Sequence, residues 1–292
     1  MRRKGRKDWE SFWVREMKKN LKYYLKDKLS AKELALVPTS FDVVGDIMIF
    51  SEFPKELSKK EKFIGGVILD IYPHIKTILK KTRKYSGKFR TAKLKVIAGE
   101  KRKETTHKEN NVFIKLDVEK VYFSARMSSE RKRVTELVKP NESVLVMFSG
   151  SGAYPLVIAK NSNAKEVYGI EISPTAHKYA LENIKKNKME GKIRLFLGDA
   201  DKVTPKINKS FDRILMPLPK GGEKFLGLAL KYTKKNGVIH FYDFLHEGEF
   251  YKAEDKAKNA CGKSKRKYKK LDLVKCGQHS PGFFRVCLDF SA

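Results

Sequence analysis

The chain of 292 residues carries 64 Lys and Arg against 34 Asp and Glu, a formal net charge of +30, and 41% of its residues are hydrophobic. This length allows about two domains of roughly 150 residues each, and the apolar content excludes a wholly disordered chain. No apolar run approaches the roughly 20 residues of a membrane span. Since the basic start also lacks the apolar stretch of a signal peptide, we expect a cytoplasmic protein that contacts no membrane.

The excess of positive charge indicates a polyanionic partner. Because repulsion between like charges opposes folding, a charge of +30 is best explained as a means of attracting nucleic acid. A composition biased toward Lys for solubility is the alternative. The three cysteines are scattered and form no CxxC pair, so we expect neither a disulfide framework nor a metal site.

Residues 1–37 are predicted to contain a basic amphipathic helix at 8–29. Apolar residues recur there at three- and four-residue steps, and residues 1–30 hold eleven Lys and Arg against four Asp and Glu. Such a pattern gives the helix one apolar and one cationic face. We favour docking of the apolar face on the body of the protein, with binding to a membrane or a partner helix as the alternative.

Residues 38–120 are predicted to form a small α/β domain that binds RNA. Segment 80–102 is rich in cations and includes Tyr85 and Phe89, a mixture suited to gripping phosphates and stacking on bases. A solvated loop is an equally good interpretation of that segment. The elements expected in this domain are a strand at 41–50, a helix at 59–81 with a kink or stop at Pro73, and strands at 93–100 and 111–124.

Residues 121–292 are predicted to form an α/β domain on a mostly parallel, doubly wound sheet, whose ligands bind at the carboxyl ends of the strands. After a basic helical stretch at 249–270, two strand-like runs flank the turn-prone HSPG and predict an antiparallel hairpin at the sheet edge. The alternating elements are strands at 142–148, 166–172, 192–198, 211–218 and 237–244, and helices at 154–161, 174–188 and 220–234.

Three successive strand ends in this domain carry groups suited to a nucleoside cofactor. Glycines after the first strand let the backbone turn under a ligand, Glu171 can accept both hydroxyls of a ribose, and Asp199 can accept an adenine amino group. Because Pro155 stands where a dinucleotide site has its third glycine, S-adenosylmethionine is the favoured cofactor. Taken singly, either carboxylate has the alternative of a surface or capping residue. The residues expected to contact the cofactor here are Phe148, Gly150, Gly152, Glu171, Ile172, Asp199 and Ala200.

Several long motifs make the chain resemble the archaeal tRNA (guanine-37-N1)-methyltransferases. The resemblance covers about residues 40–292 and rests on FDVVGDI, KFR, AGE, HKEN, VYFSARMSSERKRV, IEISP, RILMPLPK, VIHFYDF and SPGFFRVCLDF. It implies a class I S-adenosylmethionine-dependent methyltransferase fold behind a smaller RNA-binding domain. It also implies a tRNA partner, bound at its anticodon region and methylated on the base immediately 3′ of the anticodon. We expect a monomer.

The resemblance also assigns roles to single residues. N1 of guanine carries a proton, so its methylation needs a general base and a cation that steadies charge on O6. In the family these are the Glu of SERKR and the Arg of GKFR, which match Glu130 and Arg90. From the residues alone, Glu130 has the alternative of a first-turn helix carboxylate. The resemblance further places Tyr122 and Arg126 at the cofactor, and Arg131, Pro217, Leu218 and Pro219 at the substrate.

Two departures from the family pattern affect these expectations. The first-strand motif usually has an acid before its glycines, where this chain has Val146, Met147 and Phe148, so the orientation of the cofactor's methionine end is left open. The motif after the fourth strand usually has an Asn that holds the target base, and Pro217 stands there. This proline resembles the archaeal subtype implicated in wyosine formation.

The subtype makes C7 of 4-demethylwyosine, at the same tRNA position, a further candidate substrate. Two rival hypotheses stay open. One is a related aminocarboxypropyl transferase of wybutosine synthesis, which uses the same cofactor but transfers its other chain. The other is a non-catalytic tRNA-binding protein that has kept the methyltransferase fold.

Overall fold

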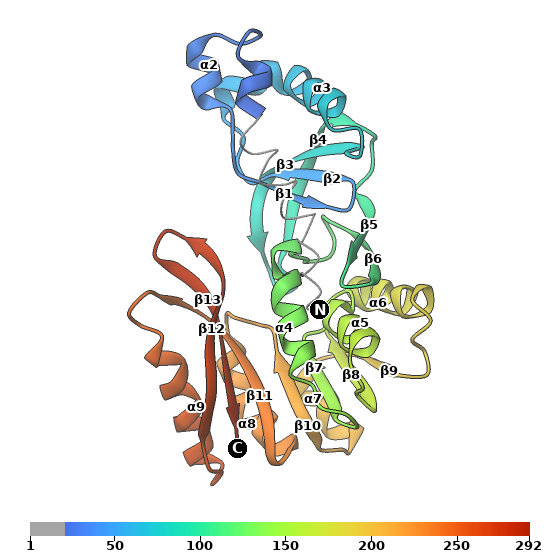
Figure 1. The fold of residues 1–292 in the computed structure, drawn as a ribbon, viewed down its shortest axis with the longest axis vertical. Helices are drawn as coiled ribbons and strands as arrows, with labels where there is room; N and C mark the ends of the chain where they lie inside the picture. Colours follow the sequence, from blue (N-terminus) through green and yellow to red (C-terminus); the bar gives the residue numbers. More distant parts are fainter. Residues whose placement is uncertain (1–20) are drawn as a thin grey trace, which may run out of the picture. The chain divides into compact units, whose positions relative to one another are not determined.

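The computed structural model describes residues 21–292 in two compact units (Figure 1). The first unit takes in the described residues up to His107 together with Leu116–Lys120, and the second takes in Lys108–Lys115 together with Val121–Ala292. The part of the expected N-terminal helix that precedes residue 21 lies outside the described residues. Among the described residues, no helix is long and apolar enough to cross a membrane.

The first unit is built on a four-stranded sheet in the order β1-β2-β3-β4. Strands β2 and β3 are parallel, and the other neighbouring pairs are antiparallel. Its elements are helical residues 21–25, α2 (Ala31–Leu36), β1 (Phe41–Val44), β2 (Ile47–Phe50), the 3₁₀ helix η1 (Lys55–Lys60), α3 (Glu61–Ile71), β3 (Thr77–Ser86) and β4 (Thr91–Gly99). Strands β5 (Glu104–Glu109) and β6 (Val112–Asp117) form a separate two-stranded sheet, through which the chain passes into the second unit.

The apolar face of the N-terminal segment packs on the first unit in its described part. Leu21, Leu25 and Leu29 lie in one buried cluster with Phe41 and Phe50 of the sheet. The favoured docking of this face is therefore confirmed for residues 21–29, and this part of the segment belongs to the first unit.

The elements of the first unit differ from the expected ones at two turns, and the structure decides between the two interpretations of segment 80–102. Gly45, at φ 58°, turns the chain between β1 and β2, so residues 41–50 form two antiparallel strands instead of one. Helix α3 stops at Ile71, in agreement with the expected break at Pro73, but residues 77–81 lie in β3 instead of continuing the helix. Most of segment 80–102 belongs to β3 and β4 and is not a loop.

The second unit is built on a seven-stranded sheet in the order β9-β8-β7-β10-β11-β13-β12. Neighbouring strands from β9 to β11 are parallel, while β13 is antiparallel to both β11 and β12. The doubly wound fold with its C-terminal antiparallel hairpin is thereby confirmed. The strands are β7 (Ser143–Met147), β8 (Glu166–Glu171), β9 (Ile193–Leu197), β10 (Phe211–Met216), β11 (Thr233–His246), β12 (Lys269–Ser280) and β13 (Phe283–Ser291).

Helices cover this sheet on both faces (Figure 1). One layer contains α4 (Ser128–Glu136), α5 (Ala153–Asn161) and α6 (Pro174–Lys186), in which α5 packs against both neighbours. The other contains α7 (Ala200–Ile207), α8 (Leu226–Tyr232) and α9 (Tyr251–Lys263), whose buried residues join the sheet in one core cluster. The 3₁₀ helices η2 (Ala125–Met127) and η3 (Gly222–Phe225) precede α4 and α8. Helix α7 was not expected from the sequence, α4 begins where the first-turn alternative for Glu130 placed a helix, and α8 begins later than the predicted residue 220.

Candidate functional site

The loop after β7 has the backbone shape of a ligand cradle. Phe148, Gly150 and Gly152 all have positive φ angles, 61°, 57° and 85°. A Cβ on Gly150 would meet only the Tyr122 carbonyl oxygen, at 3.9 Å, so open space lies over this glycine. A Cβ on Gly152 would lie 3.3 Å from that of Ala180, which shows that Gly152 instead lets α5 approach α6 closely.

Two hydroxyl groups of the same loop are buried beneath the backbone cradle. Ser149 Oγ and Ser151 Oγ make no hydrogen bond within the described part of the chain, although both residues are buried. The Ser149 side chain lies against Gly169 of β8, where a Cβ on that glycine would be 3.1 Å from Ser149 Oγ, so the open space over Gly150 is bounded by the backbone of the loop. This arrangement suits a nucleoside cofactor such as S-adenosylmethionine.

Glu171 lies at the carboxyl end of β8, where it closes one side of the cradle. Its Oε2 accepts a hydrogen bond from Gly150 N at 2.7 Å, and its Oε1 accepts one from Ser173 N at 2.7 Å. Burial raises the pKa of the Glu171 carboxyl, because desolvation outweighs the hydrogen bonds from the backbone. Glu171 therefore fixes the glycine loop, and its contact with a ribose stays a prediction. Ile172 follows it, half-buried.

The next two strand ends contribute residues in part as expected. Asp199 is half-buried and caps α7, with Oδ1 accepting a hydrogen bond from Asp201 N at 3.1 Å. The side chain of Ala200 packs into the core, so only its backbone remains for a cofactor. After β10, Leu218 N donates to Met216 O at 2.7 Å, which makes a tight turn centred on Pro217. Pro217 and Leu218 are half-buried and Pro219 is buried.

Glu130 is buried in the first turn of α4, with 4% of its surface exposed. Arg133 donates to both carboxylate oxygens, from Nε to Oε2 at 2.7 Å and from Nη2 to Oε1 at 2.8 Å. The Tyr242 hydroxyl donates to Oε1 at 2.7 Å. A carboxylate has about four acceptor positions. These three bonds therefore leave one acceptor position on Oε2.

The tyrosine that holds Glu130 belongs to a chain of buried hydroxyl groups. Tyr154 of α5 donates to the Tyr242 hydroxyl oxygen at 2.9 Å, and Tyr242 in turn donates to Glu130. Burial raises the pKa of both tyrosines well above the ordinary value. Both phenols therefore stay protonated at neutral pH and keep donating toward the carboxylate.

Arg131, which is predicted to contact the substrate, is buried and makes its contacts within the second unit. Its side chain is buried, and its guanidinium contacts both oxygens of the Glu109 carboxylate and the carbonyl oxygen of Ser124. The guanidinium also lies 5.1 Å from the ring centre of Phe123. These contacts give Arg131 a structural role beneath the start of α4.

The remaining predicted residues lie at the surface of their units. Tyr122 is 36% exposed, and its hydroxyl accepts a hydrogen bond from Arg285 Nη2 at 3.0 Å. Arg126 is exposed in η2. Arg90 belongs to the first unit, where it ends the turn between β3 and β4 with φ 50°. Its role beside the base stays a prediction.

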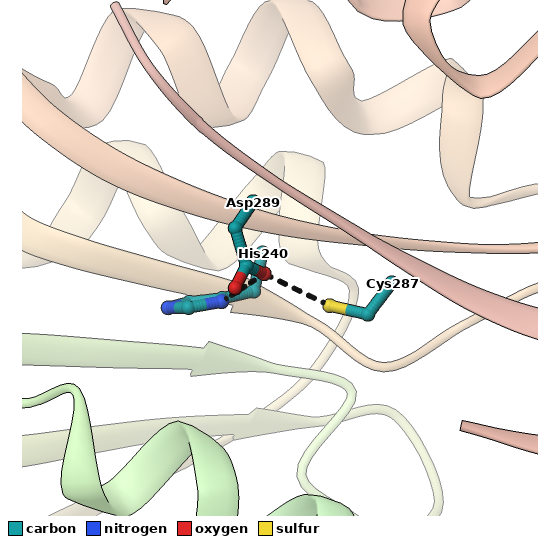
Figure 2. Close-up of side chains that lie close together, drawn as sticks. All are labelled: His240, Cys287 and Asp289. Carbon is teal, nitrogen blue, oxygen red and sulfur yellow. Dashed lines mark hydrogen bonds and ion pairs between the residues drawn. The ribbon is translucent and has the colours of Figure 1, made fainter. Parts of the chain in front are cut away.

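Polar residues of β11 and β13, which the sequence reasoning missed, complete the surroundings of Glu130. His240, Cys287 and Asp289 are buried and bring a nitrogen, a sulfur and an oxygen within 4.8 Å of one another (Figure 2). Asp289 Oδ1 lies 2.6 Å from His240 Nδ1 and 3.1 Å from Cys287 Sγ. A signal was present, because His and Asp interrupt the otherwise apolar runs VIHF and VCLDF.

The three residue types of this cluster can bind a metal ion, but the positive charges beside them oppose one. Arg133 Nη1 donates to Asp289 Oδ2 at 2.6 Å, and Arg213 Nη1 lies 2.7 Å from His240 Nε2. A metal ion would have to displace these bonds and add positive charge between two guanidinium groups. We therefore interpret His240, Cys287 and Asp289 as part of a hydrogen-bond network.

An aromatic and cationic cluster lies toward the carboxyl end of β11, on the sheet face that also carries His240. The Phe244 ring contacts those of His279 and Phe283, with centroids 4.7 and 5.9 Å apart. The Arg285 guanidinium lies 5.1 Å from the Phe244 ring centre and also donates to Tyr122. This surface can stack on a planar ring.

Comparison with known proteins agrees with this geometry. The model of the TRM5/TYW2 methyltransferase domain matches residues 105–269, and that of the TYW2 N-terminal domain matches residues 21–102. The chain is 38% identical over 255 residues to the tRNA (guanine(37)-N(1))-methyltransferase Trm5b of Pyrococcus abyssi, covering 87% of this chain and 75% of that protein. It is 35% identical over 260 residues to the tRNA (guanine(37)-N(1))/4-demethylwyosine(37)-methyltransferase Taw22 of Nanoarchaeum equitans, covering 72% and 85%.

A relative named for a different activity is nearly as similar. The tRNA(Phe) (4-demethylwyosine(37)-C(7)) aminocarboxypropyltransferase of Methanocaldococcus jannaschii is 34% identical over 252 residues, covering 85% of this chain and 96% of that protein.

Solved structures show the same fold. The crystal structure of Trm5b from Pyrococcus abyssi superposes with a TM-score of 0.81 at 37% identity, covering 90% of this chain and 78% of that one. The structure of P. horikoshii TYW2 in complex with MeSAdo gives a TM-score of 0.78 at 27% identity, covering 94% and 98%. With the sheet order, the glycine cradle and these similarities together, the chain belongs to the TRM5/TYW2 family of S-adenosylmethionine-dependent methyltransferases.

Proposed function

We propose that this protein transfers a methyl group from S-adenosylmethionine to N1 of guanosine at position 37 of tRNA. The observation that carries the proposal is the buried carboxylate of Glu130, held by Arg133 and Tyr242 with one acceptor position left on Oε2. The names of the Trm5b and Taw22 relatives support the choice of substrate.

The residues of the second unit have distinct tasks in this reaction. Bound S-adenosylmethionine supplies an electrophilic methyl group. Glu171 and the loop around Gly150 hold the cofactor, while Glu130 Oε2 accepts the N1 proton of guanine as N1 attacks. The hydrogen bonds from Arg133 and Tyr242 keep the carboxylate in one rotamer, so it does not have to be ordered during the reaction. Arg90, from the first unit, is proposed to stabilise the negative charge that develops on O6 of guanine.

The tRNA is proposed to bind through its anticodon region to a monomer of this protein in the cytoplasm. Basic residues exposed on α9 and β12 offer phosphate contacts, and the ring cluster of Phe244, His279 and Phe283 offers stacking for unpaired bases. Both features fit a strand whose bases are turned out of a helix.

The turn at Pro217 supports a second substrate, the tricyclic base 4-demethylwyosine, methylated at C7. An Asn at this position offers a donor and an acceptor to a base edge, whereas Pro217 offers a rigid apolar surface. A pocket less committed to the polar edge of guanine can admit the larger ring. The name of the Taw22 relative, which includes both bases, is consistent with this proposal.

One specific observation keeps aminocarboxypropyl transfer as a second candidate. Residues 21–102 match the TYW2 N-terminal domain, and the aminocarboxypropyltransferase relative is 34% identical along 96% of its own length. The two reactions leave different products from one cofactor, because methyl transfer leaves S-adenosylhomocysteine and aminocarboxypropyl transfer leaves methylthioadenosine.

The deciding experiment incubates the protein with undermodified tRNA and S-adenosylmethionine labelled separately in the methyl group and in the aminocarboxypropyl chain. We expect methyl label in N1-methylguanosine at position 37 and S-adenosylhomocysteine in equal amount. Label from the aminocarboxypropyl chain in the tRNA would establish the second candidate. Binding of tRNA without any modified nucleoside, and without cofactor binding, would establish the non-catalytic alternative.

A further inference from the structure

A ladder of side chains runs along one face of the β11–β13 pair, beneath α4. The register pairs His240 with Asp289 and Tyr242 with Cys287. Because side chains two residues apart in a strand share a face, these four residues project together on the side where Tyr242 meets Glu130. The ladder therefore connects the interior of the sheet with the proposed base.

Arg133 is the link between this ladder and Glu130. Its Nε and Nη2 donate to Glu130 at 2.7 and 2.8 Å, while its Nη1 donates to Asp289 Oδ2 at 2.6 Å. The two carboxylates come from elements far apart in the sequence and share one guanidinium. The guanidinium is planar and its donors have fixed directions. Asp289, by holding Nη1, therefore determines how Nε and Nη2 of Arg133 face Glu130.

The position of Asp289 is in turn set by a histidine with a defined tautomer. Arg213 Nη1 lies 2.7 Å from His240 Nε2, and an arginine can only donate, so Nε2 accepts. The proton is then on Nδ1, which donates to Asp289 Oδ1 at 2.6 Å. Burial lowers the pKa of His240 more than its bond to Asp289 raises it, which keeps the imidazole neutral. Glu142 balances the charge of Arg213 through a bond of 2.8 Å.

The charges of the network explain why the contact between Asp289 and Arg133 matters for Glu130 as the proposed base. Glu130 and Asp289 are two carboxylates on the single cation Arg133, and Arg213 is already balanced by Glu142. One negative charge is therefore in excess beside Glu130. A carboxylate that had Arg133 to itself would hold a proton less readily, because an undivided positive charge favours the ionised form. The other groups that face Glu130 are Tyr242 of β11, Cys287 of β13 and Tyr154 of α5, all in their neutral forms.

We propose that Asp289, oriented by His240, is a positioning residue for methyl transfer: it holds one side of Arg133, which fixes the guanidinium against Glu130 and shares its positive charge between the two carboxylates. This inference rests on the proposed function, in which Glu130 is the general base. Neither Asp289 nor His240 needs to touch the substrate.

The test compares single-turnover methylation of undermodified tRNA as a function of pH in the wild type and in Asp289→Asn. The amide keeps the size of the side chain but removes its charge, so Arg133 acts on Glu130 alone. We expect the acidic limb of the profile to move down by roughly one pH unit and the plateau rate to fall about tenfold. Cofactor affinity should stay at the wild-type value. Because the tRNA is the same in every assay, differences between profiles belong to the enzyme.

Asp243→Asn is the matched control. Asp243 is a buried aspartate on β11, and its side chain lies on the sheet face opposite to those of His240 and Tyr242. It pairs with Lys256 of α9 at 2.5 Å. The substitution removes the same charge from the opposite face of the sheet without touching Arg133. Its profile should superpose on that of the wild type.

Two substitutions of His240 keep the proposal testable if Asp289→Asn does not fold. Asn places an amide donor near the position of Nδ1, whereas Gln places its amide near that of Nε2. We expect His240→Asn to keep the wild-type profile, because the bond to Asp289 remains, and His240→Gln to shift it as Asp289→Asn does. Equal profiles for the two variants would overturn the proposal.

The outcomes also separate this inference from the proposed function. A Glu130→Gln variant that methylates at the wild-type rate would refute the base itself. An inactive Glu130→Gln together with an unshifted profile for folded Asp289→Asn would refute only the role of Asp289.

Discussion

The guanidinium of Arg133 donates to the Asp289 carboxylate at 2.6 Å, although 156 residues separate them in the chain. Through this pair, the first helix of the second unit is tied to the last strand of the sheet. The same guanidinium holds Glu130, so the proposed base is ordered by contacts that form only in the folded protein. Substitutions in this network and in the glycine cradle should therefore have separate, measurable effects.

Replacing the proposed base should slow chemistry without weakening cofactor binding. For Glu130→Ala we expect turnover to fall roughly 10²–10⁴-fold, because N1 then loses its proton to water. Single-turnover assays and calorimetry with S-adenosylmethionine measure the two effects. Glu136→Gln, an exposed change on the same helix, should behave as the wild type. Unaltered single-turnover methylation by folded Glu130→Ala would remove Glu130 from the mechanism.

Replacing Glu171 should weaken cofactor binding in two ways at once. The alanine variant lacks an acceptor for the ribose hydroxyls, and Gly150 N has no carboxylate to donate to, so the loop is less well ordered. We expect a substantially higher Kd for S-adenosylmethionine and an unchanged Kd for tRNA. The exposed change Glu190→Ala is the control. Wild-type cofactor affinity in calorimetry would place the ribose elsewhere.

Pro217→Asn should separate the two proposed substrates. The restored amide can hold guanine, so N1-methylation should persist, while C7-methylation of 4-demethylwyosine should fall because the apolar surface is removed. Both activities are followed on one tRNA preparation. A parallel fall of the two activities in a folded variant would show that Pro217 only shapes the turn after Met216. The role of Pro217 in choosing between the two bases is also refuted if the wild-type protein never methylates 4-demethylwyosine.

Exposed lysines at the end of α9 and in the segment that follows it should contribute to tRNA binding through phosphates. The segment 252–270 holds nine Lys and Arg against two Asp and Glu. Changing Lys263, Lys267 and Lys269 together to Gln should weaken binding and reduce the slope of log affinity against log salt by about one for each phosphate that is no longer neutralised. The matched Lys→Arg triple variant keeps the charge and should keep the slope. An unchanged slope in the Gln variant would assign this surface a solubilising role.

The network should also make stability depend on acid pH. Burial opposes the charged form of Asp289, but hydrogen bonds from His240 and Arg133 outweigh it and lower the pKa of this carboxyl. Because the pKa of Asp289 is lower in the folded than in the unfolded state, its ionised form stabilises the protein at pH values above the unfolded pKa of about 3.9. This contribution is lost as the pH falls from that value toward the pKa of the folded state. Between pH 5 and pH 2.5, roughly, the free energy of unfolding should therefore fall less in Asp289→Asn than in the wild type. Equal slopes for the two proteins in urea titrations would contradict the pairing.

Much of the second unit could be predicted because its elements carry local signals. The apolar strands and the helices between them follow from periodicity, and the glycines around Gly150 indicate a tight turn. The acid at Glu171 falls at a strand end, and parallel strands bring such ends together at one edge. Helix α7 was missed because it is short and carries Pro205 within it, which weakens the helical pattern.

In the first unit, local signals indicated the wrong elements at two turns. Gly45 interrupts an apolar run that reads as one strand, and the fold uses its positive φ to reverse the chain. Residues after Pro73 have a pattern compatible with either helix or strand. Pairing with β2 and β4 decides for the strand β3, because these residues then satisfy the facing backbone groups of both neighbouring strands, which a helix could not do.

Sequence patterns were sufficient to predict the fold class and the cofactor class, and they offered the start of a helix as one alternative for Glu130. The partners of Glu130 and the engagement of Arg131 with Glu109 emerge only in the folded molecule. The reason is physical: hydrophobic periodicity and turn residues act over a few positions, whereas an ion pair between Arg133 and Asp289 depends on sheet order and strand register. The register of β13 on β11 is set by burial of one whole face, so it brings His240 and Asp289 together without any local signal for that pairing.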